Sequence, residues 1–178
     1  HKRVTNEIGS TYTPNKTGGT AATKAGKFID EMVRRFFNEG KMPDNIDFKM
    51  TSKAYMALKE ALEGLKAKLK KKGYKVHANN VVVWDSNAGV AGELDILVFK
   101  PNGKFAIVDI KTSAYSVHSP DYTSTVVGNG LHRSKEKQHR MQLTMYKRLL
   151  ENQYNSPDLV EELIIYPLMI QKDKDGKV

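Results

Sequence analysis

The chain has no cysteine among its 178 residues. This absence excludes disulfide bonds, cysteine-ligated zinc sites and thiol nucleophiles. The chain also lacks any apolar run approaching the roughly 18 residues of a membrane-spanning helix, which excludes a membrane span. No secretory signal is visible at its start, so we expect a cytoplasmic protein.

Acidic residues are fewer than basic ones. The chain has 29 Lys and Arg against 20 Asp and Glu, a formal net charge of +9 and a pI near 9.5. This balance favours an anionic partner, and nucleic acid is the leading candidate once a membrane is excluded. A basic protein without a nucleic-acid role is the alternative that the composition leaves open.

Composition and length indicate one globular domain. Hydrophobic residues make up 39% and charged residues 28% of the chain, which is typical of a folded protein. We therefore expect residues 1–178 to form a single domain with its own core. Within it, the polar residues 1–19 are predicted to be a flexible arm or loop, and residues 113–134 a long irregular loop on the substrate side.

Apolar residues recur at three- and four-residue spacing in several segments, as in amphipathic helices. Helices are predicted over residues 20–38, 52–72 and 135–152. Thr51 or Ser52 can cap the second helix, and Gly73 is a suitable end for it.

Four segments have the alternation or β-branched content of strands. Strands are predicted over residues 81–85, 94–99, 105–111 and 163–171. In the second of these, Leu94, Ile96 and Val98 are expected on one face and Asp95, Leu97 and Phe99 on the other. The order of elements predicts an α/β protein of the α+β type, in which helices flank a mixed central sheet and the middle strands form hairpins.

Two charged residues share one face of the strand over residues 105–111. Asp109 and Lys111 are two positions apart, and charges on an otherwise apolar strand are unfavourable unless they face a cleft or a metal ion. An ordinary charge pair on an edge strand is the alternative. Asp95 lies one hairpin away, however, so we expect chemistry at this hairpin.

Two carboxylates on neighbouring strands repel each other unless a divalent cation lies between them. With no cysteine and no clustered histidine, oxygen ligands favour Mg²⁺ or Mn²⁺ over zinc. Lys111 lies within reach of a phosphate oxygen or a metal-bound water. Such a set suits phosphodiester hydrolysis, which needs a cation to activate water and a positive group to stabilise developing charge.

Three short motifs follow one another in the chain. They are Gly92-Glu93-Leu94-Asp95, then after thirteen residues Asp109-Ile110-Lys111-Thr112, and finally Gln142-Leu143-Thr144-Met145-Tyr146. In this order, on a predicted strand, strand and helix, they resemble the PD-(D/E)XK nuclease superfamily, and more narrowly its RecB-like branch with a QxxxY motif. The resemblance extends from about Gly26 to Tyr146 and implies a restriction-endonuclease-like core.

The resemblance also implies roles for particular residues. Asp95 and Asp109 would be metal ligands together with the Ile110 carbonyl, and Lys111 would be the catalytic lysine. Gln142 and Tyr146 would contact the DNA backbone or brace the site. Two further candidates for DNA binding come from the residues themselves: Gln138, which shares a helix side with Gln142, and Arg133, in the basic and aromatic loop.

One position departs from the family pattern. The branch often has a GxxxH-like helix whose histidine is another metal ligand, and here Asp30 follows Gly26 at that position. Aspartate also binds Mg²⁺ or Mn²⁺ through oxygen, so Asp30 is the predicted upstream ligand. A surface ion pair of Asp30 with Arg34 is the alternative. Glu31 is the second candidate ligand, although it points away from the apolar stripe of its helix.

The expected function is therefore that of an Mg²⁺- or Mn²⁺-dependent deoxyribonuclease. The resemblance favours an exonuclease that acts on DNA ends or single strands in recombination, repair, or phage or mobile-element DNA processing. A helicase or another recombination protein is the candidate protein partner. Two alternatives are a nucleic-acid-binding scaffold without catalysis and a structure-selective endonuclease of the same superfamily.

Overall fold

A computed structural model describes the backbone of residues 2–3, 19–44, 51–113, 125–127, 131–133 and 135–169, and side chains over residues 29–44, 51–111 and 139–168. The helices are α2 (Gly19–Glu39), α3 (Ser52–Lys71) and α4 (Lys135–Gln153); the strands of the main sheet are β1 (Lys2–Arg3), β2 (Lys75–Asp85), β3 (Val90–Phe99), β4 (Phe105–Ser113) and β7 (Val160–Met169). None of the described helices is long and apolar enough to cross a membrane.

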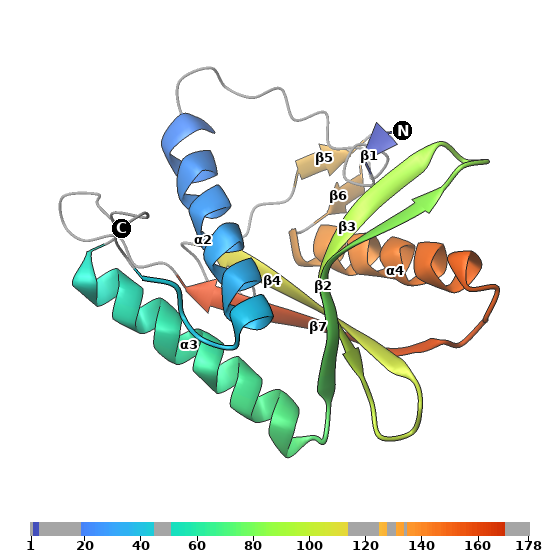
Figure 1. The fold of residues 1–178 in the computed structure, drawn as a ribbon. Helices are drawn as coiled ribbons and strands as arrows, with labels where there is room; N and C mark the ends of the chain where they lie inside the picture. The colour runs from blue at the N-terminus through green and yellow to red at the C-terminus, as the bar shows by residue number, and fades with distance from the viewer. Residues whose placement is uncertain are drawn as a thin grey trace.

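A mixed sheet forms the middle layer (Figure 1). β3 pairs antiparallel with β2 on one side and with β4 on the other, β4 pairs parallel with β7, and β1 pairs parallel with the start of β3. The predicted mixed sheet with meandering middle strands and flanking helices is confirmed. β2 is longer than predicted because its first half, from Lys75 to Asn79, also pairs with β3. A strand at the edge of a sheet tolerates polar side chains there.

Helices cover both faces of the sheet. α2 and α3 pack on one face, where Leu58, Leu62, Leu65 and Leu69 of α3 are buried, and α4 packs on the other face through Leu143, Leu149 and Leu150. Thr51 caps α3 by accepting a hydrogen bond from the Ala54 N–H, as predicted. Gly73 takes a left-handed φ of +73° just after this helix, which also agrees with its predicted role.

The alternation of β4 is confirmed. Ala106, Val108 and Ile110 face α2 and α3, whereas Ile107 lies in the core beneath α4. Asp109 is two positions from Ile107 and lies on the side of the sheet that carries α4.

The alternation predicted for β3 is wrong at Leu94. Ile96 and Val98 face α2 and α3, but Leu94 lies with Leu97 in the core beneath α4. The reason is a local irregularity at Asp95. The pairing of β2 with β3 passes over Asn80, which has a φ of +49°, and over Asp95 opposite it.

The terminal arm and the long loop both contain some regular structure. In the arm, Lys2–Arg3 form β1, and residues 4–18 lie outside the described part of the chain. In the loop, β5 (Thr125–Val127) pairs antiparallel with β6 (Leu131–Arg133). The prediction of irregular structure is therefore wrong for these short strands, which pair too locally to leave a clear sequence pattern; the remainder of the loop is outside the described residues.

Glu151 ties the end of α4 to the start of β7. Its Oε1 accepts hydrogen bonds from Lys147 Nζ at 2.8 Å and from the Val160 N–H at 3.0 Å. Burial acts to raise the pKa of Glu151, but the bonds from Lys147 and Val160 outweigh burial and hold the pKa below its ordinary 4.5. This carboxylate therefore fixes the first residue of β7 beside α4.

Replacing Glu151 with Ala should lower the free energy of unfolding by about 1–3 kcal/mol at neutral pH, because the Val160 N–H loses its acceptor and the Lys147 ammonium keeps only the Val160 carbonyl. Since the folded-state pKa lies below the ordinary value, this contribution is present above pH 4.5 and is lost as the pH falls through the folded-state pKa. Denaturant titrations of both proteins at neutral and acidic pH measure the difference. The control Glu60→Ala, on the exposed side of α3, should change stability by less than about 0.5 kcal/mol. Equal losses in the two variants would contradict the assignment.

Candidate active site

Asp109 and Lys111 form a buried ion pair near the end of β4. Asp109 is 2% exposed, and Lys111 Nζ lies 2.9 Å from its Oδ2 and 3.1 Å from its Oδ1. β4 lies between β3 and β7 in the sheet. The alternative of an ordinary charge pair on an edge strand therefore does not hold, because both residues stand on an interior strand.

Asp95 reaches β4 from the neighbouring strand. Its Oδ2 accepts a hydrogen bond from the Ile110 N–H at 2.6 Å. The pairing of β3 with β4 ends at Ile96 and Val108, one step before this contact. The carboxylate thus takes the place of a backbone acceptor where the two strands separate, and this brings it beside Asp109 and Lys111.

The electrostatics of the three groups are coupled. Burial is the main reason that the pKa of Asp95 rises to about 7, and the charge of Asp109 adds to the rise, against the Ile110 N–H and Lys111. Burial also raises the pKa of Asp109, against the opposing charge of Lys111. For Lys111, burial favours the neutral amine, but the charges of Asp109 and Asp95 outweigh it and raise the pKa. Lys111 is therefore a buried cation whose charge is stabilised by two carboxylates that repel each other.

Gln142 and Tyr146 extend this network onto α4. Lys111 Nζ donates to Gln142 Oε1 at 3.2 Å, and Gln142 Nε2 donates to the Tyr146 hydroxyl at 2.8 Å. Both side chains are buried, at 9% and 5% exposure. The i, i+4 spacing that places them on one side of the helix therefore directs them toward Lys111.

Asp30 stands on α2 at an exposed position, within electrostatic reach of the site. Loss of water around its carboxyl group is the largest cause that raises its pKa; the charge of Lys111 lowers the pKa, and those of Glu93 and Asp109 raise it further. Asp30 therefore experiences the charges of Lys111 and Asp109, although it stands on α2 and these two residues stand on β4.

Glu31, the second upstream candidate, has other partners. Arg34 donates to both of its oxygens, at 2.8 and 2.5 Å, and Arg35 Nε donates to Oε1 at 2.8 Å. The hydrogen bonds from Arg34 and Arg35 lower the pKa of Glu31 to about 2. Arg34 thus gives its described hydrogen bonds to Glu31, which argues against the alternative of an Asp30–Arg34 ion pair.

The paired carboxylates fit a hard divalent cation. Asp109 Oδ2 is buried and accepts no hydrogen bond within the described residues, although Lys111 Nζ is 2.9 Å away. A cation held by Asp95 and Asp109 would remove the repulsion that raises the pKa of Asp95. Among the described side chains, however, no three or more of His, Asp or Glu lie close enough together to hold a metal ion. The site therefore contains two neighbouring carboxylates, those of Asp95 and Asp109, without a third acidic side chain or a histidine close enough to join them among the described residues.

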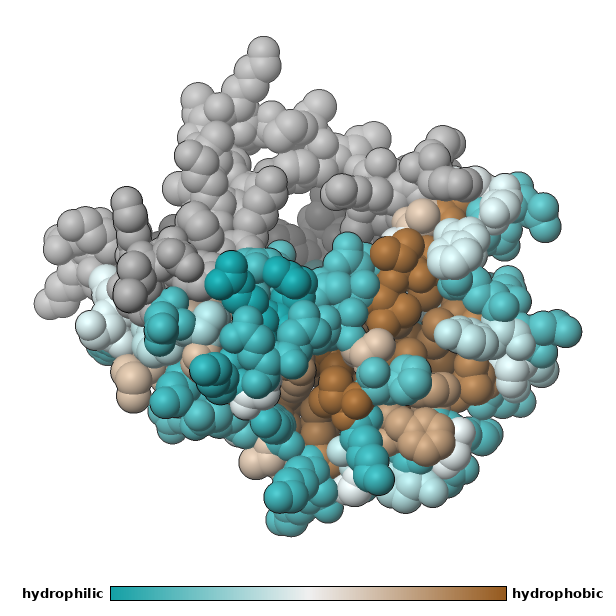
Figure 2. Space-filling model, in the orientation of Figure 1, coloured by the Kyte–Doolittle hydropathy of each residue, from teal (hydrophilic) through white to brown (hydrophobic). Residues whose placement is uncertain are grey.

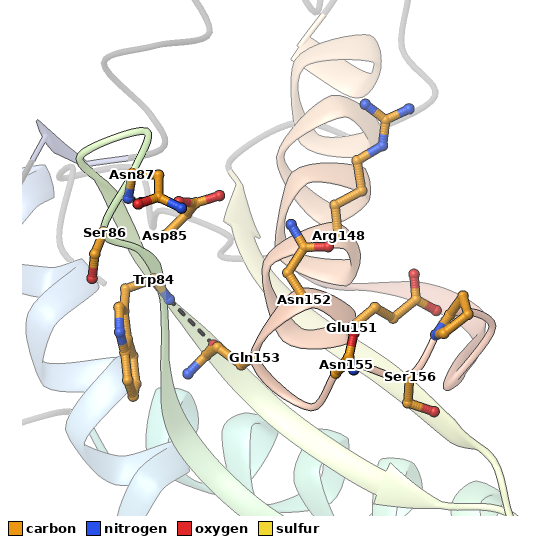
Figure 3. A pocket seen from close by; sticks show the side chains of 11 residues that line it. Trp84, Asp85, Ser86, Asn87, Arg148, Glu151, Asn152, Gln153, Asn155 and Ser156 are labelled. Atoms are coloured by element: carbon orange, nitrogen blue, oxygen red, sulfur yellow. Dashed lines mark hydrogen bonds between the residues drawn. The ribbon is translucent and has the colours of Figure 1, made fainter.

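A separate pocket lies at the far end of the β2–β3 hairpin (Figure 3). It is lined by the hairpin tip, including Asp85 and Asn87, and by the last two turns of α4, including Arg148 and Asn152. Asp95, Asp109 and Lys111 do not line it, so this pocket is separate from the network around Lys111.

Gln138 is in α4 and Arg133 in β6, but their side chains lie outside the described residues. The sequence patterns did not indicate a role for Asn80. Its Nδ2 donates a hydrogen bond to Glu93 Oε1 at 2.6 Å. It has a positive φ and lies opposite Asp95 in the β2–β3 hairpin. The signal for it was the asparagine itself, which tolerates the left-handed region better than most residues.

A sequence model of the PD-(D/E)XK nuclease superfamily matches residues 11–177. This is most of the chain, so the protein belongs to the PD-(D/E)XK nuclease superfamily. The mixed sheet with its flanking helices agrees with the restriction-endonuclease-like fold of that superfamily. A comparison with curated protein sequences found no match.

The Asp95→Asn variant tests the carboxylate pair. At a pH above 7 in EDTA it should be at least as stable as the wild type, because the ionised Asp95 is unfavourable in the fold and an amide oxygen still accepts the Ile110 N–H. Mg²⁺ at about 100-fold above its Kd should raise the Tm of the wild type by about 5–10 °C. The variant should show little of this rise. Thermal unfolding followed by circular dichroism measures both effects, and an equal rise in the two proteins would place the cation elsewhere.

Proposed function

We propose that the protein is an Mg²⁺- or Mn²⁺-dependent deoxyribonuclease of the RecB-like branch. The observation that carries this proposal is the convergence of Asp95, Asp109 and Lys111, with a buried Asp109 oxygen that accepts no hydrogen bond within the described residues. Membership of the nuclease superfamily supports hydrolysis of nucleic acid. The motif order of Asp95, Asp109, Lys111 and the Gln142–Tyr146 pair supports the narrower branch.

In this proposal Asp95, Asp109 and the Ile110 carbonyl hold the cation, and Asp30 is the upstream ligand. The cation supplies Lewis acidity toward a phosphate and lowers the pKa of water. Asp30 stands on α2, and its electrostatic coupling to Asp109 supports the assignment. Its carboxylate would approach the cation from the helical side of the site.

Lys111 acts as a positive charge and not as a base. Asp109 and Asp95 raise its pKa, so the amine is protonated at neutral pH. Its ammonium is held by Asp109 on one side and by Gln142 on the other. A fixed cation of this kind stabilises negative charge that develops on a phosphate oxygen during hydrolysis.

Gln142 and Tyr146 brace this lysine rather than contact the DNA backbone directly. Each is buried, and their hydrogen bonds run from Tyr146 through Gln142 to Lys111. Gln138 and Arg133, on the same helix and on the preceding strand, remain the candidates for contacts with DNA.

We propose that residues 1–178 form one nuclease domain. Its substrates would be DNA ends or single strands, on which it would act as an exonuclease in recombination, repair, or phage or mobile-element DNA processing. The net charge of +9 favours DNA as an anionic partner. An endonuclease of the same superfamily differs only in how the substrate is presented. Covalently closed circular DNA separates the two activities, because an obligate exonuclease leaves it uncut.

Asp109→Ala and Lys111→Ala should each lower the rate of DNA cleavage by at least about 100-fold in Mn²⁺, because they remove a ligand and the fixed cation. DNA binding and the far-UV circular dichroism spectrum should change little. Labelled single-stranded and duplex DNA, with an EDTA reaction as the blank, measures cleavage. Lys53→Ala, at an exposed position in the first turn of α3, is the control and should cleave normally. Normal cleavage by either active-site variant would refute the mechanism, and an inactive wild type that still binds DNA would favour the scaffold.

Tyr146→Phe should lower kcat by about tenfold and leave KM nearly unchanged, because Gln142 loses its acceptor and positions Lys111 less well. Steady-state kinetics on one oligonucleotide separates the two constants. Tyr154→Phe removes the hydroxyl of an exposed tyrosine beyond α4 and is the matched control. A raised KM with an unchanged kcat would mean instead that Tyr146 binds the substrate.

A further inference from the structure

Val82 and Trp84 are large apolar residues exposed on β2, at 55% and 46% exposure. They alternate with Val81 and Val83, which pack in the core beneath α4. Their side chains therefore project from the opposite face of the sheet, the face that carries α2. In Figure 3 the indole of Trp84 points away from α4. Figure 2 shows hydrophobic residues gathered on the half of the molecule where β2, β3 and α4 lie in Figure 1.

This exposed face leads to the candidate active site. Val82 lies directly opposite Glu93 on β3, and Trp84 opposite Ala91, so these four side chains share one face. Glu93 precedes Asp95 by two positions on β3. The exposed pair therefore lies on the same hairpin as one carboxylate of the candidate site, a few residues from it.

The chemistry of the surface suits nucleobases. Further along the same face of the sheet, Ile96 and Val98 are buried against α2 and α3, but Val82 and Trp84 stay exposed. An exposed tryptophan beside a nuclease site offers a flat ring on which an unpaired base can stack, whatever the sequence. Val82 and Trp84 are about 7 Å apart along the strand, twice the rise per stacked base, so each can meet a different base of an unstacked strand.

We propose that Val82 and Trp84 form a contact surface for unpaired bases of the DNA strand that is held at the active site. The proposal rests on the proposed nuclease function and names two residues that would favour single-stranded DNA or frayed ends over intact duplex. Stacking on Trp84 holds the strand near its bases, and the carboxylate and lysine site acts on its backbone.

The protein contains a single tryptophan, which makes the test direct. Wild-type protein in EDTA, which prevents cleavage, is titrated with a short single-stranded oligonucleotide and with a blunt duplex of equal length. The single strand should quench Trp84 emission more strongly than the duplex does. Trp84→Ala should weaken binding of a labelled single strand by about 5- to 150-fold, and Trp84→Phe should recover part of the loss.

Val82→Ser provides a second, milder variant and should weaken binding of the single strand in the same direction. Tyr154→Ala removes an aromatic side chain that is 65% exposed beyond the end of α4, and should leave binding unchanged. Thermal unfolding of each variant confirms that it is folded. The contrast between Trp84 and Tyr154 separates stacking at this surface from a general loss of exposed aromatic area.

The outcomes distinguish this inference from the proposed function. Unchanged emission on DNA binding, or equal affinity of wild type and Trp84→Ala, would overturn the contact surface even if wild-type cleavage in Mn²⁺ is normal. Quenching with weakened binding in Trp84→Ala would support the surface even if the wild type proved unable to cleave. Emission that depends on protein concentration and not on DNA would mean that a second copy of the chain covers Trp84, and would overturn it as well.

Discussion

The hydrogen bond between the Asp95 carboxylate and the Ile110 N–H is the contact on which the site depends. It forms where β3 and β4 stop pairing, and it replaces a bond that two regular strands would make between their backbones. Because the Asp95 side chain accepts this hydrogen bond from β4, it is held beside that strand. For this reason Asp95 meets Asp109 and Lys111, although they come from different strands and are 14 and 16 positions further along the chain.

The charges of the protein act on an anionic substrate differently at long and at short distances. Over long distances the net charge of +9 attracts a polyanion such as DNA. At short range Asp95 and Asp109, with Asp30 nearby, repel a phosphate, and Lys111 balances only part of that charge. A divalent cation would remove the short-range repulsion, because it neutralises the carboxylates and gives the phosphate a positive partner. Under the proposed function, the site therefore binds a substrate and a metal ion together.

Much of this arrangement is predictable from the chain. The alternation of Ala106, Val108 and Ile110 with Asp109 and Lys111 follows from the two-residue period of a strand, which needs no tertiary information. The shared side of Gln142 and Tyr146 follows in the same way from the helical period. That this side faces Lys111, and not solvent, depends on how α4 packs against the sheet, which single-sequence patterns do not encode.

The failures have a common cause. Leu94 was expected beside Ile96, but the irregularity at Asp95 and Asn80 turns it to the other face. That irregularity arises from contacts between three strands, so a rule for one isolated strand cannot foresee it. The first half of β2 was missed for a similar reason, since its polar residues form a strand only because β3 lies beside them.

We propose that Asp95 and Asp109 together bind a divalent cation beside Lys111. A crystal of the protein grown with Mn²⁺, measured at a wavelength where manganese scatters anomalously, tests this site. We expect an anomalous peak between the two carboxylates, with at least one oxygen of each within about 2.0–2.6 Å, the range of oxygen ligands for hard divalent cations. A well-ordered site without a peak there, or a peak bound only by other residues, would contradict it.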